Sequence, residues 1–449
     1  MGQNRRTLNI WVARAMPLLM AGMVGYATWV FLSLVCVHYL LFDRKRKVAA
    51  ALLFAFYFVF FALLSISYLR TVITLTFNPG YVQQGRNTDD AANLSEKPRV
   101  DGAEDGDLET GLRSAQPARI TATEGSTEGL ARVMTDTSLD TALREGPPQP
   151  SPGAPTMTGP PTQILGRPYS QWTYPRPEAQ SAPSNLKEFL NKEIFVCESD
   201  GLPRYCSKCD CWKPDRAHHC SEVGRCVWRM DHFCPWVGGV VAETSFRYFY
   251  QVVVFGTVYC LFLIVTLGVL MHERNKAGMN VDSKWVAALV LACIFALFSA
   301  GMTFSTSQLI WSNVSTIDSL SVKTKVYQLA VHDPNPPAPS FASIDSNPYK
   351  PSGTRVWLPP NPGPGEEQRC YVIVRTRPGE NPWKLNSTYA NFKESLGGSW
   401  WHWFKFWGVP KPGSSGGEQG FYRWNPEIIS RLKKEAGIPV EHTHDKVQG

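Results

Sequence analysis

Four long apolar runs limit what this chain can fold into. Residues 16–37, 48–69, 248–271 and 285–309 contain no charged side chain. A membrane hydrocarbon core about 30 Å thick requires roughly 20 apolar residues in a helix, and each run is long enough to cross it. The alternative for any single run is a buried core helix, but uncharged runs beyond roughly 18 residues favour the membrane. We therefore predict an all-α membrane protein with four transmembrane helices.

Positive charges predict which side of the membrane the polar segments occupy. With an even number of spans, the N-terminal tail, residues 70–247 and the C-terminal region share one face. Basic residues favour the cytosol for that face; they are Arg5, Arg6, Arg14, Arg70, Lys213, Arg216, Arg225, Arg229, Arg247, Lys323 and Lys325. The loop at residues 43–47 is also basic and argues against this orientation. We predict a cytosolic face, because free thiols and structural zinc suit a reducing compartment.

Composition divides the polar segments further. Residues 83–184 are rich in Pro, Ser, Thr, Gly and acidic side chains, which predicts a disordered insert. The net charge of +7 is too small to indicate a nucleic-acid partner, and we expect none. We predict five segments: residues 1–82 with the first two helices, the insert at 83–184, a cysteine-rich module at 185–247, the last two helices at 248–311, and a cytosolic C-terminal region at 312–449.

A cysteine and histidine array precedes the third apolar run. Cys206 and Cys209 form a C-x2-C pair, which is followed by His219 and Cys226. A C-x2-C pair with a more distant His and Cys is typical of a tetrahedral zinc site. A disulfide framework is the alternative, but a reducing compartment disfavours it. Cys211 and His218 are additional potential ligands that lie outside this spacing.

The array ends in a group of residues suited to thiol chemistry. Cys234 is a candidate nucleophile, and His232 lies two residues before it. The imidazole can take the thiol proton, while the adjacent Asp231 can orient the imidazole and favour its protonated form. This pattern indicates acyl transfer through a cysteine at the surface of a membrane.

The array resembles the cysteine-rich module of the DHHC-type protein S-acyltransferases. The matching positions are Cys206, Cys209, Lys213, Pro214, Arg216, His219, Cys220, Cys226, Asp231, His232, Cys234, Trp236, Val237, Val241 and Phe249. The match extends outside the module to Asn78-Pro79-Gly80, to Ser315-Thr316-Ile317-Asp318, and to Asn381, Asn391 and Gly397. Only the insert and the last stretch of the chain lie outside the resemblance.

The resemblance also implies two interleaved Cys3His zinc sets. The first would be Cys206, Cys209, His219 and Cys226, all present. The second falls on Cys220, Val223, Phe233 and Val240, where three of the four ligands are replaced by apolar residues. We therefore predict a single structural zinc, with an apolar cluster at the second site and Cys220 as a buried thiol.

The resemblance to this family implies transfer of a long-chain fatty acyl group, palmitoyl above all, from acyl-CoA to cysteines of membrane-associated proteins. The steps would pass through an acyl-enzyme at Cys234 with ping-pong kinetics. Trp236 is expected to line the acyl entrance, and Lys213, Arg216 and Arg229 to meet the CoA phosphates. A catalytically silent zinc-binding membrane adaptor is the alternative function. A transporter is disfavoured, because the spans contain no charged residues.

Overall fold

The computed structural model describes residues 2–84, 186–336, 352–360, 367–397 and 420–439, together with residues 163–164, 167–168, 365 and 403. The chain divides into two compact units, Met1–Thr88 with Tyr174–Gly449, and Asp89–Thr173. In the second unit only β1 (Gln163–Ile164) and β2 (Arg167–Pro168), an antiparallel pair, are described. Most of the predicted insert at residues 83–184 therefore lies outside the described residues.

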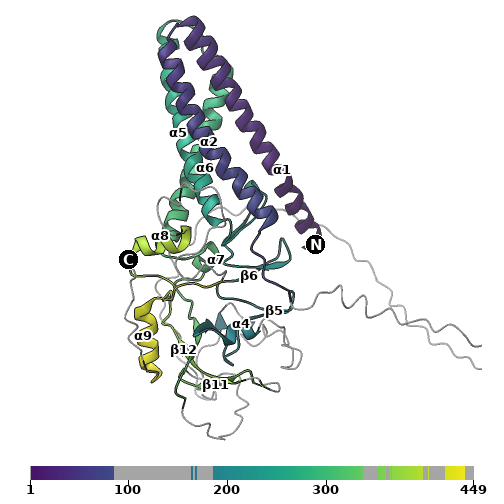
Figure 1. The fold of residues 1–449 in the computed structure, drawn as a ribbon. Helices are drawn as coiled ribbons and strands as arrows, with labels where there is room; N and C mark the ends of the chain where they lie inside the picture. Colours follow the sequence, from purple (N-terminus) through teal and green to yellow (C-terminus); the bar gives the residue numbers. More distant parts are fainter. Residues whose placement is uncertain are drawn as a thin grey trace, which may run out of the picture. The chain divides into compact units, whose positions relative to one another are not determined.

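Four long helices dominate the first unit (Figure 1). They are α1 (Gly2–Trp29), continued by the π-helical η1 (Val30–Asp43), then α2 (Lys47–Phe77), α5 (Phe246–Lys276) and α6 (Ser283–Trp311). Each contains a stretch long and apolar enough to cross a membrane. The prediction of four apolar helices is confirmed, and each helix extends beyond its predicted run because polar residues at the ends continue the helical geometry.

The cysteine-rich module lies between α2 and α5 in the sequence and consists of three short antiparallel hairpins. These are β4 (Tyr205–Cys206) with β5 (Cys211–Trp212), β6 (His218–Cys220) with β7 (Arg225–Val227), and β8 (His232–Cys234) with β9 (Gly239–Val241). The 3-10 helix η4 (Pro235–Val237) forms the turn between β8 and β9. The hairpins are too short to be stable alone, so packing and bound groups must hold them.

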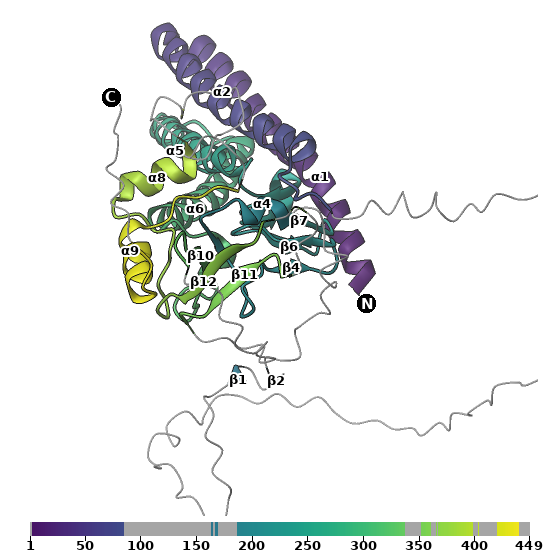
Figure 2. The same cartoon turned by 60° about the horizontal axis from the view of Figure 1, so that its bottom comes forward.

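A four-stranded antiparallel sheet supports the module. Its strands run in the order β11 (Arg355–Leu358), β12 (Arg369–Arg375), β10 (Gln328–His332) and β3 (Ile194–Val196). Side chains alternate between its faces, so Val372 and Val374 pack with α9 (Pro426–Glu435), whereas Tyr371 and Ile373 pack with α4 (Leu186–Leu190). Figure 2 shows α9 beside β10 and β12.

Two further helices connect the sheet region to the long helices. The one-turn α7 (Thr316–Ser319) follows α6 closely, and α8 (Thr388–Leu396) contacts both α5 and α6. Asn391 on α8 donates a 3.0 Å hydrogen bond to the carbonyl of Trp311, at the C-terminus of α6. That contact satisfies one of the carbonyls that a helix end leaves without a partner.

The prediction of an all-α protein is wrong outside the long helices. The sheet forms because residues such as Tyr371, Val372, Ile373 and Val374 are aromatic or β-branched, which suits a pleated strand buried on both faces. Of the paired strands, only β11 and β12 are neighbours in the sequence; β3 and β10 come from earlier segments, so no local hairpin pattern indicates their pairing.

Candidate active site

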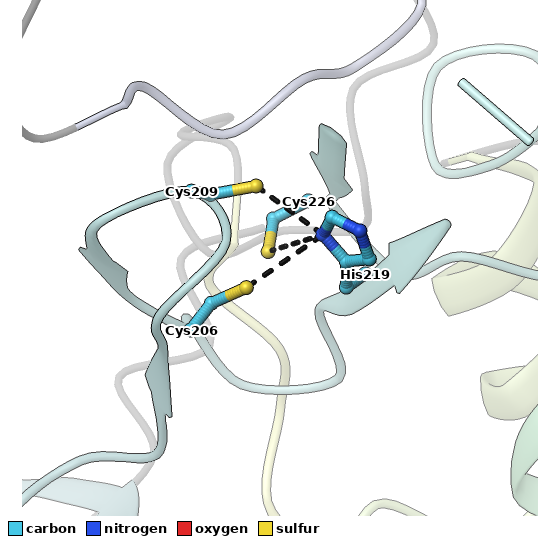
Figure 3. A group of neighbouring side chains, drawn as sticks. All are labelled: Cys206, Cys209, His219 and Cys226. Atoms are coloured by element: carbon cyan, nitrogen blue, oxygen red, sulfur yellow. Dashed lines mark hydrogen bonds between the residues drawn. The ribbon is translucent and has the colours of Figure 1, made fainter. Parts of the chain in front are cut away.

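Four side chains with metal-ligating atoms converge in the module (Figure 3). They are Cys206, Cys209, His219 and Cys226, and their ligand atoms all lie within 4.8 Å of one another. The Nδ1 atom of His219 is 3.6 Å from the sulfur of Cys206, 3.3 Å from that of Cys209 and 4.0 Å from that of Cys226. We call these four residues the ligand cluster.

Two local structures bring the ligand cluster together. A tight turn follows Cys206, in which the N–H of Cys209 donates a 3.2 Å hydrogen bond to the carbonyl of Cys206. In the β6–β7 hairpin, His219 lies directly opposite Cys226. Residues directly opposite each other in an antiparallel pair place their side chains on the same face, so both reach the turn.

The spacing of the ligand cluster fits zinc. Zinc binds sulfur at about 2.3 Å and imidazole nitrogen at about 2.0–2.1 Å, so tetrahedral geometry separates the two donors by about 3.6 Å. The three measured nitrogen–sulfur distances, from 3.3 to 4.0 Å, bracket that value. Three thiolates with one imidazole form a soft donor set, which favours zinc over magnesium or calcium.

Strand β8 carries the residues suited to thiol chemistry. Nδ1 of His232 lies 2.7 Å from Oδ2 of Asp231. Thr316 donates to the same carboxylate twice, from its backbone N–H at 2.9 Å and from its hydroxyl at 2.8 Å. Asp231 is 4% exposed, and these donors offset the cost of burying its charge. The carboxylate is therefore fixed in place and in turn fixes the imidazole.

The surroundings of His232 favour a protonated imidazole. Burial alone lowers the pKa of His232, but the hydrogen bond to Asp231 and the nearby Cys234 sulfur outweigh burial and raise the pKa from 6.5 to about 9. The imidazole also makes an edge contact with the ring of Phe249 on α5. The carboxylate of Asp231 thus stabilises a positive charge on the imidazole that lies two residues from Cys234.

The turn after Cys234 is fixed from two sides. The hydroxyl of Tyr68 on α2 donates a 2.8 Å hydrogen bond to the carbonyl of Trp236. Gly238 ends the turn with φ +86°, and a Cβ there would lie 3.3 Å from the carbonyl oxygen of Ala13 on α1. Glycine therefore suits this position for both its conformation and its close approach to α1. The nucleophile is thereby held between the first two helices.

Cys234 opens onto a cavity between the long helices. The cavity has a volume of about 690 Å³ and an almost entirely apolar lining. Cys234 and Trp236 line it, as do Thr28 and Tyr259. Phe249 and Tyr259 both line it and lie roughly ten residues apart on α5, a rise of about 15 Å. An elongated apolar group therefore fits this space, with its reactive end at Cys234.

A polar cluster lies beside the deeper part of the cavity. The hydroxyl of Tyr57 is 2.6 Å from that of Thr28 and 2.9 Å from that of Tyr259. Thr28 and Tyr259 are also part of the cavity lining. These hydroxyl groups satisfy one another in an otherwise apolar region, as buried polar groups require.

Comparison with known proteins agrees with this arrangement. The family model described as DHHC palmitoyltransferase matches residues 200–323. A palmitoyltransferase named pfa5 from Aspergillus fumigatus is 32% identical over 97% of this chain and 92% of its own length. The chain belongs to the DHHC palmitoyltransferase family.

Two further relatives extend the comparison. A palmitoyltransferase pfa5 from Emericella nidulans is 29% identical over 97% of this chain and 88% of its own length. Protein S-acyltransferase 8 from Arabidopsis thaliana is 30% identical over 36% of this chain and 41% of its own length. The function expected from the resemblance, protein S-acyl transfer, agrees with these names, and nothing supports the adaptor alternative.

Two of the basic residues assigned to CoA phosphates lie inside this DHHC palmitoyltransferase. Arg216 is 2% exposed and Arg229 is 8% exposed. Each donates a 2.9 Å hydrogen bond to the side-chain oxygen of Asn313, and Arg216 also lies 3.5 Å from a carboxylate oxygen of Asp318. We therefore withdraw both from the set of CoA contacts. Lys213, by contrast, is only half-buried.

The positions of the missing second zinc set also come together. Cys220 and Val240 are buried in one apolar cluster with Met230, and Val223 and Phe233 pack against it. We call Cys220, Val223, Phe233 and Val240 the apolar plug. In this family member, the four positions thus meet in space although three of them carry no ligand atom.

Two contacts at the site were not anticipated from the sequence. Thr316 was recognised as part of a motif, but its pair of hydrogen bonds to Asp231 was not foreseen. The contact of Tyr68 with the turn after Cys234 carries no sequence signal, because one tyrosine in an apolar run resembles any other.

Proposed function

We propose that this DHHC palmitoyltransferase transfers a long-chain fatty acyl group, palmitoyl above all, from acyl-CoA to cysteine thiols of membrane-associated proteins through an acyl-enzyme at Cys234. One observation carries the proposal. Cys234 lines an apolar cavity of about 690 Å³ and lies two residues from an imidazole held by a carboxylate. A nucleophile and a space for its acyl group are thus adjacent.

The residues support two balanced transfer steps. His232 takes the thiol proton of Cys234, and the thiolate attacks the thioester carbonyl of acyl-CoA. The carbon–sulfur bond to CoA breaks, and the CoA thiolate takes from His232 the proton that came from Cys234. In the second step His232 takes the thiol proton of a substrate cysteine, and the resulting thiolate attacks the acyl carbonyl. The carbon–sulfur bond to Cys234 breaks, and the Cys234 thiolate takes the proton from His232. Each step breaks one thioester and forms another, so positioning matters more than driving force.

Three residues have supporting roles in this proposal. Asp231 keeps His232 oriented and stabilises its charge while the sulfur is a thiolate. Trp236 lines the entrance to the acyl cavity and contacts Phe298 on α6. Lys213 is the remaining candidate from the predicted set for contact with the CoA phosphates.

The ligand cluster would hold one structural zinc through Cys206, Cys209, His219 and Cys226. Structural zinc supplies folding free energy to small domains, and no step of the transfer passes through it. The apolar plug would take the place of the second ion. Elemental analysis of the purified protein should therefore give one zinc per chain, and two would contradict the proposal.

The membrane topology proposed here has both termini and the module in the cytosol. Large apolar side chains are exposed on the outer faces of the long helices, among them Leu297 at 79%, which suits contact with lipid. All eleven cysteines lie within the described residues and none is in a disulfide, which suits a reducing compartment. The predicted segment boundaries at residues 82, 184, 247 and 311 are retained in this proposal.

The test is covalent labelling of the purified full-length protein in detergent with a tagged palmitoyl-CoA. Wild type should carry a label that hydroxylamine removes, and Cys234→Ser should carry none. Cys293→Ser is the matched control, because Cys293 is on α6 and does not line the cavity. Labelling of Cys234→Ser at the wild-type level would exclude an acyl-enzyme at this cysteine. A cysteine peptide anchored to vesicles should then receive the label from wild type.

A further inference from the structure

A short segment near the C-terminus, residues 420–425, packs against the cysteine-rich module. We call it the tail segment. Gly420 lies against the ring of Trp228, and a Cβ at Gly420 would be 1.7 Å from a ring carbon, so a larger residue would displace the ring. The N–H of Asn425 donates a 2.7 Å hydrogen bond to the carbonyl of Pro382. The tail segment is therefore fixed at both of its ends.

Tyr422, in the middle of the tail segment, reaches a buried carboxylate of the module. Its hydroxyl donates a hydrogen bond to Glu243, and the N–H of Gly420 donates a second to the same carboxylate at 3.4 Å. Tyr422 is 6% exposed and Glu243 is 8% exposed. Because a buried carboxylate is costly without hydrogen-bond donors, the tail segment stabilises Glu243 in its position.

The ring of Tyr422 also contacts two buried arginines. The guanidinium carbon of Arg216 lies 5.4 Å from the centroid of this ring, and that of Arg229 lies 6.0 Å from it. A guanidinium group is attracted to the electron-rich face of an aromatic ring. Tyr422 thus connects one buried carboxylate to two buried cations.

Arg229 links these side chains to the proposed catalytic residues, because it lies two positions before Asp231. Its φ is +39°, in a region that residues other than glycine rarely adopt. Such a conformation persists only where the surrounding structure determines it. Three contacts of the Arg229 side chain contribute, namely hydrogen bonds of 2.9 Å to Asn313 and to Ser395 and the contact with Tyr422. Loss of one of them frees the backbone just before Asp231 to change conformation.

Glu243 is connected to the same aspartate through the backbone. Its N–H donates a 3.3 Å hydrogen bond to the carbonyl of Trp228, and the N–H of Asp231 donates a 3.0 Å hydrogen bond to the carbonyl of Val241. These two hydrogen bonds join the same two stretches of backbone. A shift of Glu243 is therefore transmitted to Asp231.

We propose that Tyr422 is a positioning residue for acyl transfer. Through its contacts with the carboxylate and the arginines, it keeps Asp231 where that side chain orients His232. This inference rests on the proposed acyl-enzyme at Cys234. Tyr422 does not line the acyl cavity, so its loss should slow the chemical step without weakening the binding of acyl-CoA. A misplacement of about 1 Å can slow a catalysed step by about a hundredfold.

The test measures how fast the acyl-enzyme forms in single turnovers of the purified full-length protein in detergent, over a range of tagged palmitoyl-CoA concentrations. Tyr422→Leu removes the hydroxyl and the ring, and should lower the rate constant at saturation by roughly ten- to hundredfold. Tyr422→Phe keeps the ring beside both guanidinium groups and should be slowed less, by roughly three- to tenfold. In both variants the half-saturating concentration of palmitoyl-CoA should stay within about twofold of wild type.

Phe421→Leu is the matched control, because Phe421 is the neighbouring aromatic residue of the tail segment. It is 38% exposed and contacts the amino group of Lys192. Its rate constant should equal that of wild type, and slowing equal to that of the Tyr422 variants would overturn the proposal.

Wild-type rate constants in both Tyr422 variants would overturn the proposal too. So would a smaller labelled fraction at an unchanged rate constant, which is the result of partial unfolding, or a higher half-saturating concentration at an unchanged rate constant. If Tyr422→Leu does not fold, the rate constant of Tyr422→Phe decides the question. Absence of label in wild type would overturn the acyl-enzyme itself, which is a distinguishable failure.

Discussion

The hairpin β6–β7 places His219 opposite Cys226, and the hairpin β8–β9 places Phe233 opposite Val240. The first pair belongs to the ligand cluster, in which every position has a metal-ligating atom. The second pair belongs to the apolar plug, which packs with Met230 and Val227. The same local construction is thus completed by donor atoms in one half of the module and by hydrophobic contact in the other.

The two halves differ in how much free energy each can contribute. Zinc binding stabilises small peptides by about 10–16 kcal/mol, whereas burying one apolar side chain contributes about 1.5–3 kcal/mol. The plug therefore provides less stability, but it needs neither a metal nor deprotonated ligands. A hairpin of this module can therefore keep its register without zinc where packing between the two strands replaces the ion.

Removal of one residue of the ligand cluster should have the largest effect on the stability and zinc content of the module. Cys209→Ala leaves three donors and should cost on the order of 10 kcal/mol, which is enough to unfold the module. Zinc content measured by elemental analysis should fall to near zero, and labelling of Cys234 should disappear. Cys220→Ala, the matched loss of a thiol from the plug, should retain both. Full zinc content in Cys209→Ala would show that the ligand cluster is not the zinc site.

Placing metal-ligating residues in the apolar plug should turn it into a second zinc site. The triple variant Val223→Cys, Phe233→His and Val240→Cys, together with the native Cys220, supplies a second Cys3His set. Elemental analysis should give two zinc ions per chain in place of one. Val223→Ser, Phe233→Gln and Val240→Ser is the control, since it is equally polar but offers no comparable ligands. An unchanged zinc count in the first variant would mean that the plug has lost the geometry of a metal site.

Local spacing explains why much of this site could be predicted from the sequence. The ligand cluster spans only residues 206–226, and C-x2-C followed by His and Cys has a direct chemical meaning. Apolar run length likewise identifies the four long helices, because the bilayer sets their minimum length. In both cases the information lies within a short stretch of chain.

Non-local pairing explains what could not be predicted. Strand β3 pairs with β10, whose residues come more than a hundred positions later, so this pairing has no local signal. Arg216 and Arg229 are expected from the sequence to meet the CoA phosphates, yet Asn313 after α6 binds both inside the protein, a contact between segments far apart in the chain.

Truncation of the plug should have a moderate effect. Phe233→Ala removes the ring that packs against Val240 and should cost less than the about 3–5 kcal/mol lost at fully buried phenylalanines, because Phe233 is only half-buried. Thermal unfolding should shift to lower temperature while zinc content stays at the wild-type value. Phe233→Leu, which keeps most of the apolar volume, should recover most of the loss. A zinc content that fell in Phe233→Ala would show that the two halves of the module are not separable.

The two faces of strand β8 differ: His232 and Cys234 face the active site, and Phe233 faces the plug. The smallest expected effect is a pH-dependent loss of stability when His232 is replaced. Because the pKa of His232 is raised from 6.5 to about 9, its protonated form stabilises the fold fully below about pH 6.5, and this contribution is lost as the pH rises through about 9. That rise corresponds to at most about 3 kcal/mol. Thermal unfolding of His232→Gln should therefore lie below wild type at pH 6 and approach it at pH 10, whereas the deficit of Phe233→Ala should be the same at both. An equal deficit for His232→Gln at both pH values would show that the interaction with Asp231 does not depend on the charge of the imidazole.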